Sequence, residues 1–359
     1  MSAVASDPES LLVVRLGAMG DIIHTLPAVT ALRNALPDAR IGWMVEERWA
    51  ELLCAQNCPK SGPRGPSRPL VDFVHSVNTK AWRKSLLSRE TRKQISSALR
   101  EVRDLKYETA VDFQGALKSA VMAKCSGART IFGLDCPREV PARILYSRRV
   151  ATTKAHVIEQ YHSLAEGVAG KPLPMPAIEF PRDSQADARI ANKLAGLGIE
   201  REFVIIAPGS GWGAKQWPPE RYGAVARALA GNGLTPLINY GPGEEELAQA
   251  VQIAGGAKSH RILCSIAELI ALTRRSRLFI GGDTGPLHLA AALQVPVVAI
   301  FGPTDPARNG PYGTKSIVLR NPASRTSLSH TNAPDPGLLQ ITADEVICAA
   351  RRLLEDRHA

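Results

Sequence analysis

Short apolar segments alternate with longer amphipathic ones along most of the chain. Apolar runs at 11–16, 41–46, 109–114 and 129–134 predict buried strands, and apolar residues at helical spacing predict a helix through 24–37. Strands that are apolar over their whole length and are separated by helices are typical of a parallel sheet with helices on both faces. The first half of the chain is therefore predicted to form an α/β domain.

A second series of the same kind follows a proline-rich stretch at 170–181, where the periodicity stops. Its predicted strands are 203–210, 234–241, 277–285 and 296–303, and its predicted helices are 219–231, a segment from Glu244, and 286–293. We predict an α/β protein with two Rossmann-like, doubly wound parallel-sheet domains at 1–180 and 181–341. The amphipathic helix within 342–359 is a candidate to pack back on the first domain.

The basic residues of the chain are concentrated in one segment. The formal net charge of the 359 residues is +10, and residues 80–106 alone hold nine basic and three acidic side chains. Such a segment attracts phosphate groups in nucleic acid, anionic lipid or a phosphorylated substrate, unless it is simply a solvated helix face. Because no nucleic-acid-binding motif accompanies it, we expect no nucleic-acid partner. The stretch 57–69, rich in proline, glycine and basic residues, is predicted to be an exposed, mobile loop.

The sequence gives no sign of export or of membrane insertion. No apolar run approaches the roughly 18 residues of a spanning helix, and the N-terminus lacks a basic segment followed by an apolar one. The six cysteines are scattered, without a C-x-x-C pair or a nearby histidine cluster. We therefore expect reduced thiols in the cytoplasm rather than a disulfide framework or a structural zinc site.

The loop after the first predicted strand, RLGAMGDIIHTLP at 15–27, carries the first candidate chemistry. Gly17 and Gly20 allow a tight turn, and Asp21 and His24 lie near the start of the next helix. The G-x-x-G spacing differs from the G-x-G-x-x-G of dinucleotide binding, which disfavours a dehydrogenase. Two interpretations of Asp21 remain open: a charge that caps the helix, or a carboxylate that acts as a general base.

Three loops of the second series carry further candidate chemistry. The segment 207–222 places glycines, a serine and Lys215 between a buried strand and a helix, which suits a phosphate, although it is not a Walker loop. The segment 239–247 puts three glutamates at a helix start, where they either stabilise the helix dipole or bind a ribose diol. The absence of a D-x-D motif predicts that no metal holds a diphosphate here.

The third of these loops lies within FIGGDTGPLHLAAALQVPVVAIFG at 279–302. Asp283, Thr284 and Gly285 end a strand and begin a helix, so backbone N–H groups there can bind a diphosphate. His288 follows Thr284 by four residues and lies on the same helix face. A lone histidine in an apolar helix is usually a core residue, but its place beside this turn favours ligand binding.

Taken together, five segments resemble the heptosyltransferases of lipopolysaccharide core assembly, glycosyltransferase family 9. They are GAMGDIIHTLPAVTALRNALPDARIGWMVEE, DFQGALKSA, GSGWGAKQWPPERY, GPGEEE and GGDTGPLHLAAALQVPVVAIFGPTDP, and AWRKSLLS is most similar to heptosyltransferase I. The resemblance implies a GT-B fold, with two domains facing across a cleft. It also implies an inverting, metal-independent transfer of L-glycero-D-manno-heptose from an ADP-heptose donor to Kdo on a Kdo-lipid A acceptor, without a cofactor.

The resemblance also implies roles for particular residues, with Asp21 as the general base. The implied donor contacts are Ser210, Gly211, Lys215, Glu244, Asp283, Thr284, Gly285 and His288. The implied acceptor contacts are Gly20, His24, Arg83, Lys84 and Lys118, the basic ones facing Kdo carboxylates and lipid A phosphates. We also expect a monomer that associates reversibly with the cytoplasmic face of the inner membrane.

Several alternatives remain open at this point. The chain could be heptosyltransferase II or another family member with a different sugar or acceptor. It could also be a sugar-nucleotide epimerase of the same architecture, or a protein that binds a nucleotide or a lipid surface without catalysis. Release of an epimer without acceptor would indicate the epimerase, and binding without turnover would indicate the binding protein.

Overall fold

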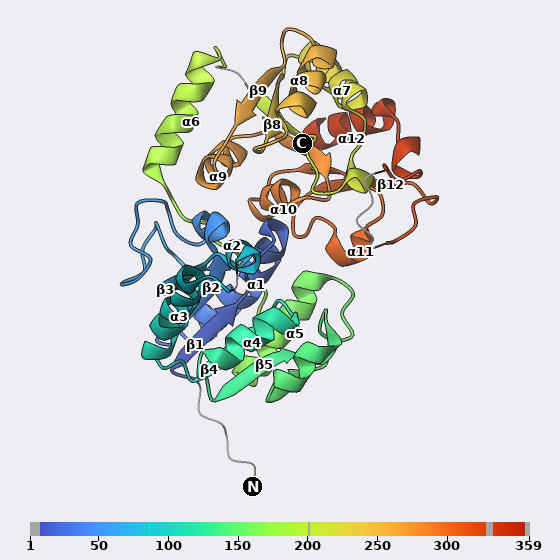
Figure 1. The fold of residues 1–359 in the computed structure, drawn as a ribbon. Helices are drawn as coiled ribbons and strands as arrows, with labels where there is room; N and C mark the ends of the chain where they lie inside the picture. The colour runs from blue at the N-terminus through green and yellow to red at the C-terminus, as the bar shows by residue number, and fades with distance from the viewer. Residues whose placement is uncertain (1–7, 86, 200–201, 328–332, 356–359) are drawn as a thin grey trace. The chain divides into compact units, whose positions relative to one another are not determined.

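The computed structural model describes residues 8–85, 87–199, 202–327 and 333–355. The chain divides into two compact units, Met1–Arg182 and Asp183–Ala359 (Figure 1). The division falls at the end of the proline-rich stretch. Each unit is an α/β structure built around its own parallel sheet.

The first unit contains a six-stranded sheet in the order β3-β2-β1-β4-β5-β6, in which all pairings are parallel. Its strands are β1 (Ser10–Val14), β2 (Arg40–Glu46), β3 (Phe73–Val77), β4 (Thr109–Asp112), β5 (Thr130–Leu134) and β6 (Arg148–Val150). Its helices are α1 (Met19–Ala35), η1 (Glu47–Leu52), α2 (Thr79–Lys84), α3 (Arg89–Asp104), α4 (Leu117–Cys125), η2 (Val140–Leu145) and α5 (Val157–Ala169). The two termed η are short 3₁₀ helices.

The second unit repeats this topology, with the order β12-β11-β10-β7-β8-β9. Its strands are β7 (Phe203–Ala207), β8 (Thr235–Tyr240), β9 (His260–Leu263), β10 (Leu278–Gly282), β11 (Val297–Phe301) and β12 (Ser316–Arg320). Its helices are α6 (Ser184–Gly196), η3 (Gly213–Lys215), α7 (Pro219–Gly231), α8 (Glu245–Gly255), α9 (Ile266–Arg274), α10 (Gly285–Ala292), α11 (Pro306–Asn309), η4 (Leu338–Gln340) and α12 (Ala343–Glu355). Counted from its own first strand, each unit has the order 3-2-1-4-5-6 of a doubly wound fold.

The central strands are apolar throughout because both faces of each sheet are covered. In the second unit Ile206 and Ile280 belong to the core on one face, and their neighbours Ile205 and Phe279 belong to the core on the other. Successive side chains of a strand point to opposite faces, so a strand between two helix layers needs apolar residues at every position. This explains the unbroken apolar runs in the sequence.

The last helix, α12, packs in the second unit. Its buried Val346, Ala350 and Leu353 complete the core that contains Ile300, and α12 lies against α7, β11 and β12. The expectation that the helix within 342–359 packs back on the first domain is therefore corrected. The physical reason is that α12 supplies the apolar cover for one face of the second sheet. Residues 356–359 lie outside the described residues.

The proline-rich loop 57–69 is largely exposed, as predicted, and one buried arginine makes several contacts with its backbone. Arg68 is buried, and its guanidinium donates to the carbonyl oxygens of Pro63 at 3.0 Å and Val71 at 3.1 Å, as well as to those of Pro59 and Gly62. A buried guanidinium needs partners for its N–H groups, and the loop's carbonyls supply them.

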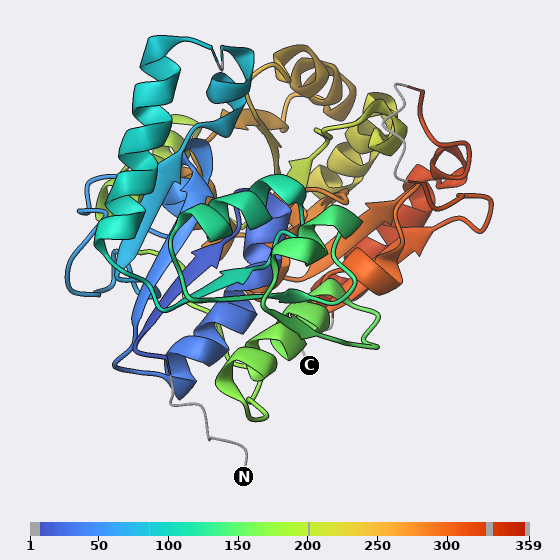
Figure 2. The same ribbon diagram turned by 60° about the horizontal axis from the view of Figure 1, so that its bottom comes forward.

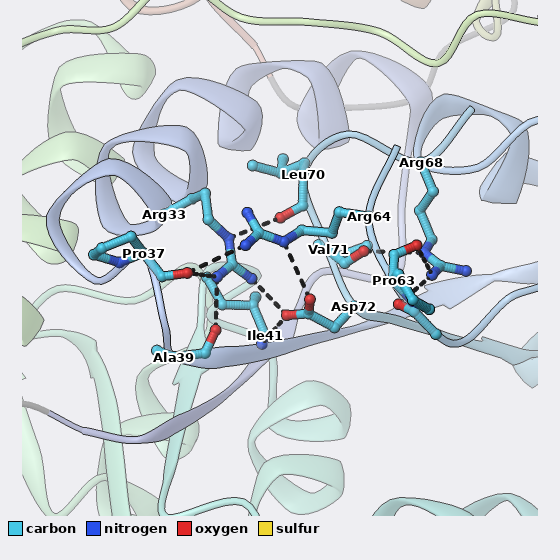
Figure 3. A network of polar contacts seen from close by, with 11 residues as sticks. Arg33, Pro37, Ala39, Ile41, Pro63, Arg64, Arg68, Leu70, Val71 and Asp72 are labelled. Atoms are coloured by element: carbon cyan, nitrogen blue, oxygen red, sulfur yellow. Dashed lines mark hydrogen bonds and ion pairs between the residues drawn. The ribbon is translucent and has the colours of Figure 1, made fainter. Parts of the chain in front are cut away.

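A second anchor beside this loop is the carboxylate of Asp72 (Figure 3). It pairs with Arg33 of α1 at 2.6 Å and with Arg64 of the loop at 3.2 Å, and it accepts from the backbone N–H of Ile41 at 2.8 Å. The loop is thus tied to a helix and a strand of the first unit. Charge-assisted hydrogen bonds of this kind are among the stronger ones in proteins.

Three further observations concern the expectations about membranes, metals and thiols. No helix in the described ranges is long and apolar enough to span a bilayer. Within the same ranges, no group of three or more His, Cys, Asp or Glu side chains is arranged to hold a metal ion. All six cysteines are free thiols.

Candidate functional site

The candidate residues lie where the strand order of each sheet reverses. This happens between β1 and β4 in the first unit and between β7 and β10 in the second. At such a switch point the loops from neighbouring strands lead to opposite faces of the sheet, which opens a crevice for ligands.

Asp21 lies in the first turn of α1, which begins at Met19. Its Oδ2 accepts from the backbone N–H of Ala18 at 3.1 Å and pairs with Nη2 of Arg15 at 2.8 Å, and 38% of its side chain is exposed. Both contacts use Oδ2. Within the described ranges Oδ1 carries no hydrogen bond. Asp21 therefore caps the helix with one carboxylate oxygen and keeps the other available for a ligand.

Arg15, which the sequence analysis did not single out, fixes the orientation of Asp21. It is buried immediately after β1, donates to the carbonyl oxygen of Phe113 at 2.8 Å, and its Cζ lies 5.5 Å from the ring centre of Tyr161. Burial alone would lower the pKa of Arg15, but Tyr161, Asp21 and Asp112 together raise it. The guanidinium therefore stays charged. The signal in the sequence is an arginine that interrupts a buried apolar run.

The predicted acceptor residues of α1 have different surroundings. Gly20 is half-buried next to Asp21. His24, one turn further on, is buried, and its ring lies edge-to-face with that of His156 at 6.1 Å between centroids. The structure thus leaves Gly20 partly accessible beside Asp21 at the start of α1, whereas His24 is buried.

The predicted basic acceptor residues gather where α4 begins next to α2. Nζ of Lys118 donates to Oγ1 of Thr79 at 2.8 Å, and the Thr79 hydroxyl donates to the buried Glu46 carboxylate. Burial lowers the pKa of Lys118, and the nearby Arg83 lowers it further, although Glu46 opposes the shift. Arg83 and Lys84 are exposed at the end of α2. Thr79 and Glu46 were not predicted as site residues: Glu46 lies at the end of the first of the five family-like segments, and Thr79 lies in none of them.

In the second unit, Asp283 joins the two loops of the switch point. Its Oδ2 lies 2.6 Å from Nζ of Lys215, and its Oδ1 lies 3.0 Å from Nε2 of His288. Burial alone would raise the pKa of Asp283, but His288 and Lys215 hold it well below its usual range. Since a carboxylate repels a diphosphate, we infer that Asp283 holds these two side chains for a ligand rather than contacting phosphate itself.

The residues after Asp283 form the start of α10. Thr284 is its N-cap residue, and Thr284 and Gly285 are half-buried just after the carboxyl end of β10. The first N–H groups of a helix have no partner within the helix, and the helix dipole is positive at this end. The turn is therefore suited to an anion, as the sequence indicated.

The loop after β7 is shaped by its own contacts. Oγ of Ser210 donates to the carbonyl oxygen of Trp212 at 2.6 Å, and Nζ of Lys215 lies 4.6 Å from the centre of the Trp212 ring. Trp212 was not predicted. A Cβ at Gly211 would meet no atom within 4 Å, so this glycine leaves open space beside Ser210.

Glu244 is the one of the three glutamates that lies against this loop. Its Oε2 accepts from the backbone N–H of Gly241 at 2.8 Å. A Cβ added to Gly209 would lie 2.2 Å from Oε1 of Glu244, so the glycine is needed for the carboxylate to lie there. Glu245 and Glu246 are exposed in the first turn of α8. Of the three glutamates, Glu244 is therefore the one whose carboxylate lies beside the loop after β7.

A pocket of about 650 Å³ opens beyond the carboxyl ends of β8 and β9. Pro242, Leu263, Cys264 and Ser265 line it, together with residues of α6 and α9. Pro242 is two residues from Glu244, so the pocket lies next to the start of α8. No motif predicted it.

Comparison with known proteins connects this geometry to one family. The family model for glycosyltransferase family 9 (heptosyltransferase) matches residues 95–335. Lipopolysaccharide heptosyltransferase 1 of Pseudomonas aeruginosa is 27% identical over 352 residues, which are 95% of this chain and 94% of that protein.

Two solved structures agree with this assignment. The E. coli heptosyltransferase WaaC with ADP is 26% identical, with 97% of this chain and 99% of that chain covered and a TM-score of 0.76. The same enzyme with ADP-2-deoxy-2-fluoro heptose gives 25% identity, the same coverage and a TM-score of 0.73. The two six-stranded parallel sheets are those of a GT-B enzyme. The chain belongs to glycosyltransferase family 9, the heptosyltransferases.

Proposed function

We propose that this enzyme transfers L-glycero-D-manno-heptose from ADP-heptose to a Kdo residue of Kdo-lipid A, with inversion and without a metal. The observation that carries the donor part is the Lys215–Asp283–His288 cluster at the second switch point. The similarity to an enzyme solved with ADP and with an ADP-heptose analogue supports the same donor.

In this proposal the loops after β7, β8 and β10 of the second unit bind the donor along its length, from the adenine to the sugar. The pocket beyond β8 and β9 receives the adenine, and the Glu244 carboxylate accepts from the ribose diol. The N–H groups at Thr284 and Gly285 and the ammonium group of Lys215 bind the diphosphate. His288, held by Asp283, contacts the donor at the sugar–phosphate junction.

The chemistry is a single displacement at the anomeric carbon. Oδ1 of Asp21 takes the proton of the Kdo hydroxyl as the oxygen attacks, while Arg15 holds Oδ2. The bond from the anomeric carbon to the diphosphate breaks as the new carbon–oxygen bond forms, which inverts that carbon. The negative charge that grows on the departing ADP is stabilised by Lys215 and the helix N-terminus, so the proposal requires no metal.

We also propose that the enzyme associates reversibly with the cytoplasmic face of the inner membrane, as a monomer. The acceptor is a membrane lipid, and the exposed basic side chains of residues 80–106 attract its phosphates. Arg83, Lys84 and Lys118 would bind the Kdo carboxylates and lipid A phosphates. This attraction should weaken as salt is raised.

The test is incubation with ADP-heptose and Kdo-lipid A, separately and together, followed by mass spectrometry of the products. We expect one added heptose with inverted anomeric configuration when both substrates are present, and the same rate with a chelator. Free epimer without acceptor would establish the epimerase instead. Product formed solely with an acceptor that already carries heptose would indicate heptosyltransferase II.

Asp21→Asn tests the general base. We expect a loss of about a hundredfold or more in turnover, the range typical of a general base, with ADP affinity unchanged in calorimetry. Asp38→Asn, an exposed carboxylate just after the same helix, is the matched control and should retain full turnover. Near-normal turnover in the Asp21 variant would remove this residue from the mechanism.

A further inference from the structure

The first unit has an exposed apolar surface on α4 and η2. Leu117 and Val121 of α4 are each 44% exposed, and Val140 and Ile144 of η2 are 73% and 85% exposed. We name these four residues the α4–η2 patch. Single exposed aliphatic residues are common, but a gathering of four on adjacent elements is typical of an interaction site.

Backbone contacts hold the two elements of this patch together. The N–H of Leu117 donates to the Glu139 carboxylate at 2.8 Å, and the N–H of Glu139 donates to the carbonyl oxygen of Gly115 at 2.8 Å. Val140, next to Glu139, is therefore fixed near the start of α4. Figure 2 shows α4 and η2 side by side, and the two elements also pack on each other. The four residues of the patch therefore lie on two elements that pack against each other.

Folding alone does not explain why these large side chains face outward. The fully buried hydrophobic residues of α4 and η2 are the small Ala120, Ala123 and Ala142, and the larger Met122 and Leu145 are partly buried against the same core. Burial of larger aliphatic side chains would stabilise the unit more, by roughly 1.5–3 kcal/mol for each Val, Leu or Ile side chain. The four aliphatic side chains of the patch nevertheless remain exposed. This distribution indicates a partner outside the folded unit.

The surroundings of the patch carry positive charge. Residues 116–150 contain seven basic and two acidic residues. Both acidic residues are engaged: Asp135 pairs with Arg143 at 2.8 Å and lies 3.8 Å from Arg149, and Glu139 accepts from a backbone N–H. Arg148 is exposed on β6. An apolar centre with an arginine-rich rim complements a surface that is apolar inside and anionic outside.

We propose that the α4–η2 patch docks on an anionic phospholipid bilayer. Val140 and Ile144 enter the headgroup region, and the rim arginines meet lipid phosphates. This inference rests on the proposed function in one respect, because the acceptor of that reaction is a bilayer lipid. A second copy of the chain is a poorer occupant, since its own basic rim would be repelled.

The experiment is co-sedimentation of the whole protein with vesicles, in the absence of donor and acceptor. We expect binding to vesicles that contain phosphatidylglycerol and little binding to phosphatidylcholine alone. Val140→Ser combined with Ile144→Ser should weaken binding at least about tenfold, because two aliphatic side chains no longer leave water. Ile253→Ser is the matched control, since Ile253 is also 73% exposed but lies on α8 of the second unit.

The contribution of the arginines around the α4–η2 patch to vesicle binding is tested by Arg148→Gln combined with Arg149→Gln. We expect severalfold weaker binding that no longer falls as steeply with salt, whereas Arg351→Gln with Arg352→Gln on α12 should change neither. Equal binding by wild type and the Val140/Ile144 variant would overturn the proposal. So would a dimer in size-exclusion chromatography that this variant converts to a monomer, because the patch would then be a protein interface.

Failure of the proposed function and failure of this proposal give different results. Vesicle binding requires no turnover, so it would persist if the chain transferred another sugar. Conversely, heptose transfer to a water-soluble, deacylated acceptor should be the same in wild type and in the Val140/Ile144 variant. With acceptor embedded in anionic vesicles, the variant should be severalfold slower. Equal rates on the embedded acceptor would also count against docking through this patch.

Discussion

The two units place a buried carboxylate at equivalent points of the same topology. Asp112 ends β4 in the first unit, and Asp283 follows β10, the corresponding strand of the second. Asp112 accepts from neutral donors, among them the hydroxyls of Tyr146 at 2.7 Å and Ser119 at 2.9 Å. Asp283 instead faces Lys215 and His288.

This difference reverses the direction of the pKa shift. Burial raises the pKa of Asp112, and hydrogen bonds from Tyr146, Ser119 and the backbone offset it in part. The pKa of Asp283 is lowered although burial again opposes the charge, because the hydrogen bonds and charge interactions with His288 and Lys215 outweigh burial. Asp112 organises the loop around it through hydrogen bonds. Asp283 instead holds the Lys215 ammonium group at the loops where we propose that the diphosphate binds.

The largest effect is expected from Asp283→Asn. The amide removes the charged partner of the half-buried Lys215 ammonium group, and breaking a fully buried ion pair typically costs about 3–5 kcal/mol, which is an upper bound for this pair. Urea unfolding at neutral pH would measure this loss. We also expect ADP affinity to fall, because Lys215 and His288 lose their common anchor. A variant as stable as wild type would show that the ion pair is not maintained in solution.

The pH dependence of this variant provides a second measurement. A carboxyl group whose pKa is lowered by folding stabilises the protein above its unfolded value, about 3.9, and this stability is lost as the pH falls below that value. The advantage of wild type over Asp283→Asn should therefore be constant near neutral pH and shrink below about pH 4. The slope is at most about 1.4 kcal/mol per pH unit. Urea midpoints over this range would test it.

Asp112→Asn should have a smaller effect of the opposite pH sign. The hydroxyl groups of Tyr146 and Ser119 can turn to pair with the amide, so we expect a loss of about 1–2 kcal/mol at neutral pH. A raised pKa means that the folded state binds the proton more tightly. Wild type should therefore gain stability relative to this variant as the pH falls toward about 4. Parallel pH profiles for the two variants would contradict the assigned directions.

The fold could be predicted from the sequence because its strongest signals are local. The central strands are buried on both faces and are therefore apolar throughout. Their apolar runs predicted these strands with small errors at the ends. The family and the GT-B fold are confirmed. The edge strands β3, β6, β9 and β12 were missed. They are partly exposed, as the burial of β6 and β12 shows, and so lack an unbroken apolar run.

The candidate site was less predictable because its contacts join distant segments. The pairing of Lys215 with Asp283 spans 68 positions. That of Arg15 with the carbonyl of Phe113 spans 98. No spacing rule connects such residues. The sequence identified the loops and most of the charged groups, but not which partner each would face. The sequence also could not show that Arg68 turns inward, so the contacts that hold the loop 57–69 were not predicted.

The smallest expected effect is that of Gly209→Ala, which tests the contact between the loop after β7 and Glu244 at the start of α8. In Gly209→Ala the new Cβ would lie 2.2 Å from Oε1 of Glu244, so the carboxylate must move. Because the obstructing atom is the end of a flexible side chain, we expect less than about 1 kcal/mol of lost stability. If Glu244 holds the ribose, KM for the donor should rise severalfold with little change in kcat. Gly231→Ala at the end of α7, where a Cβ meets nothing within 4 Å, should leave both unchanged. An unaltered KM in the Gly209 variant would mean that the position of Glu244 does not matter for the donor.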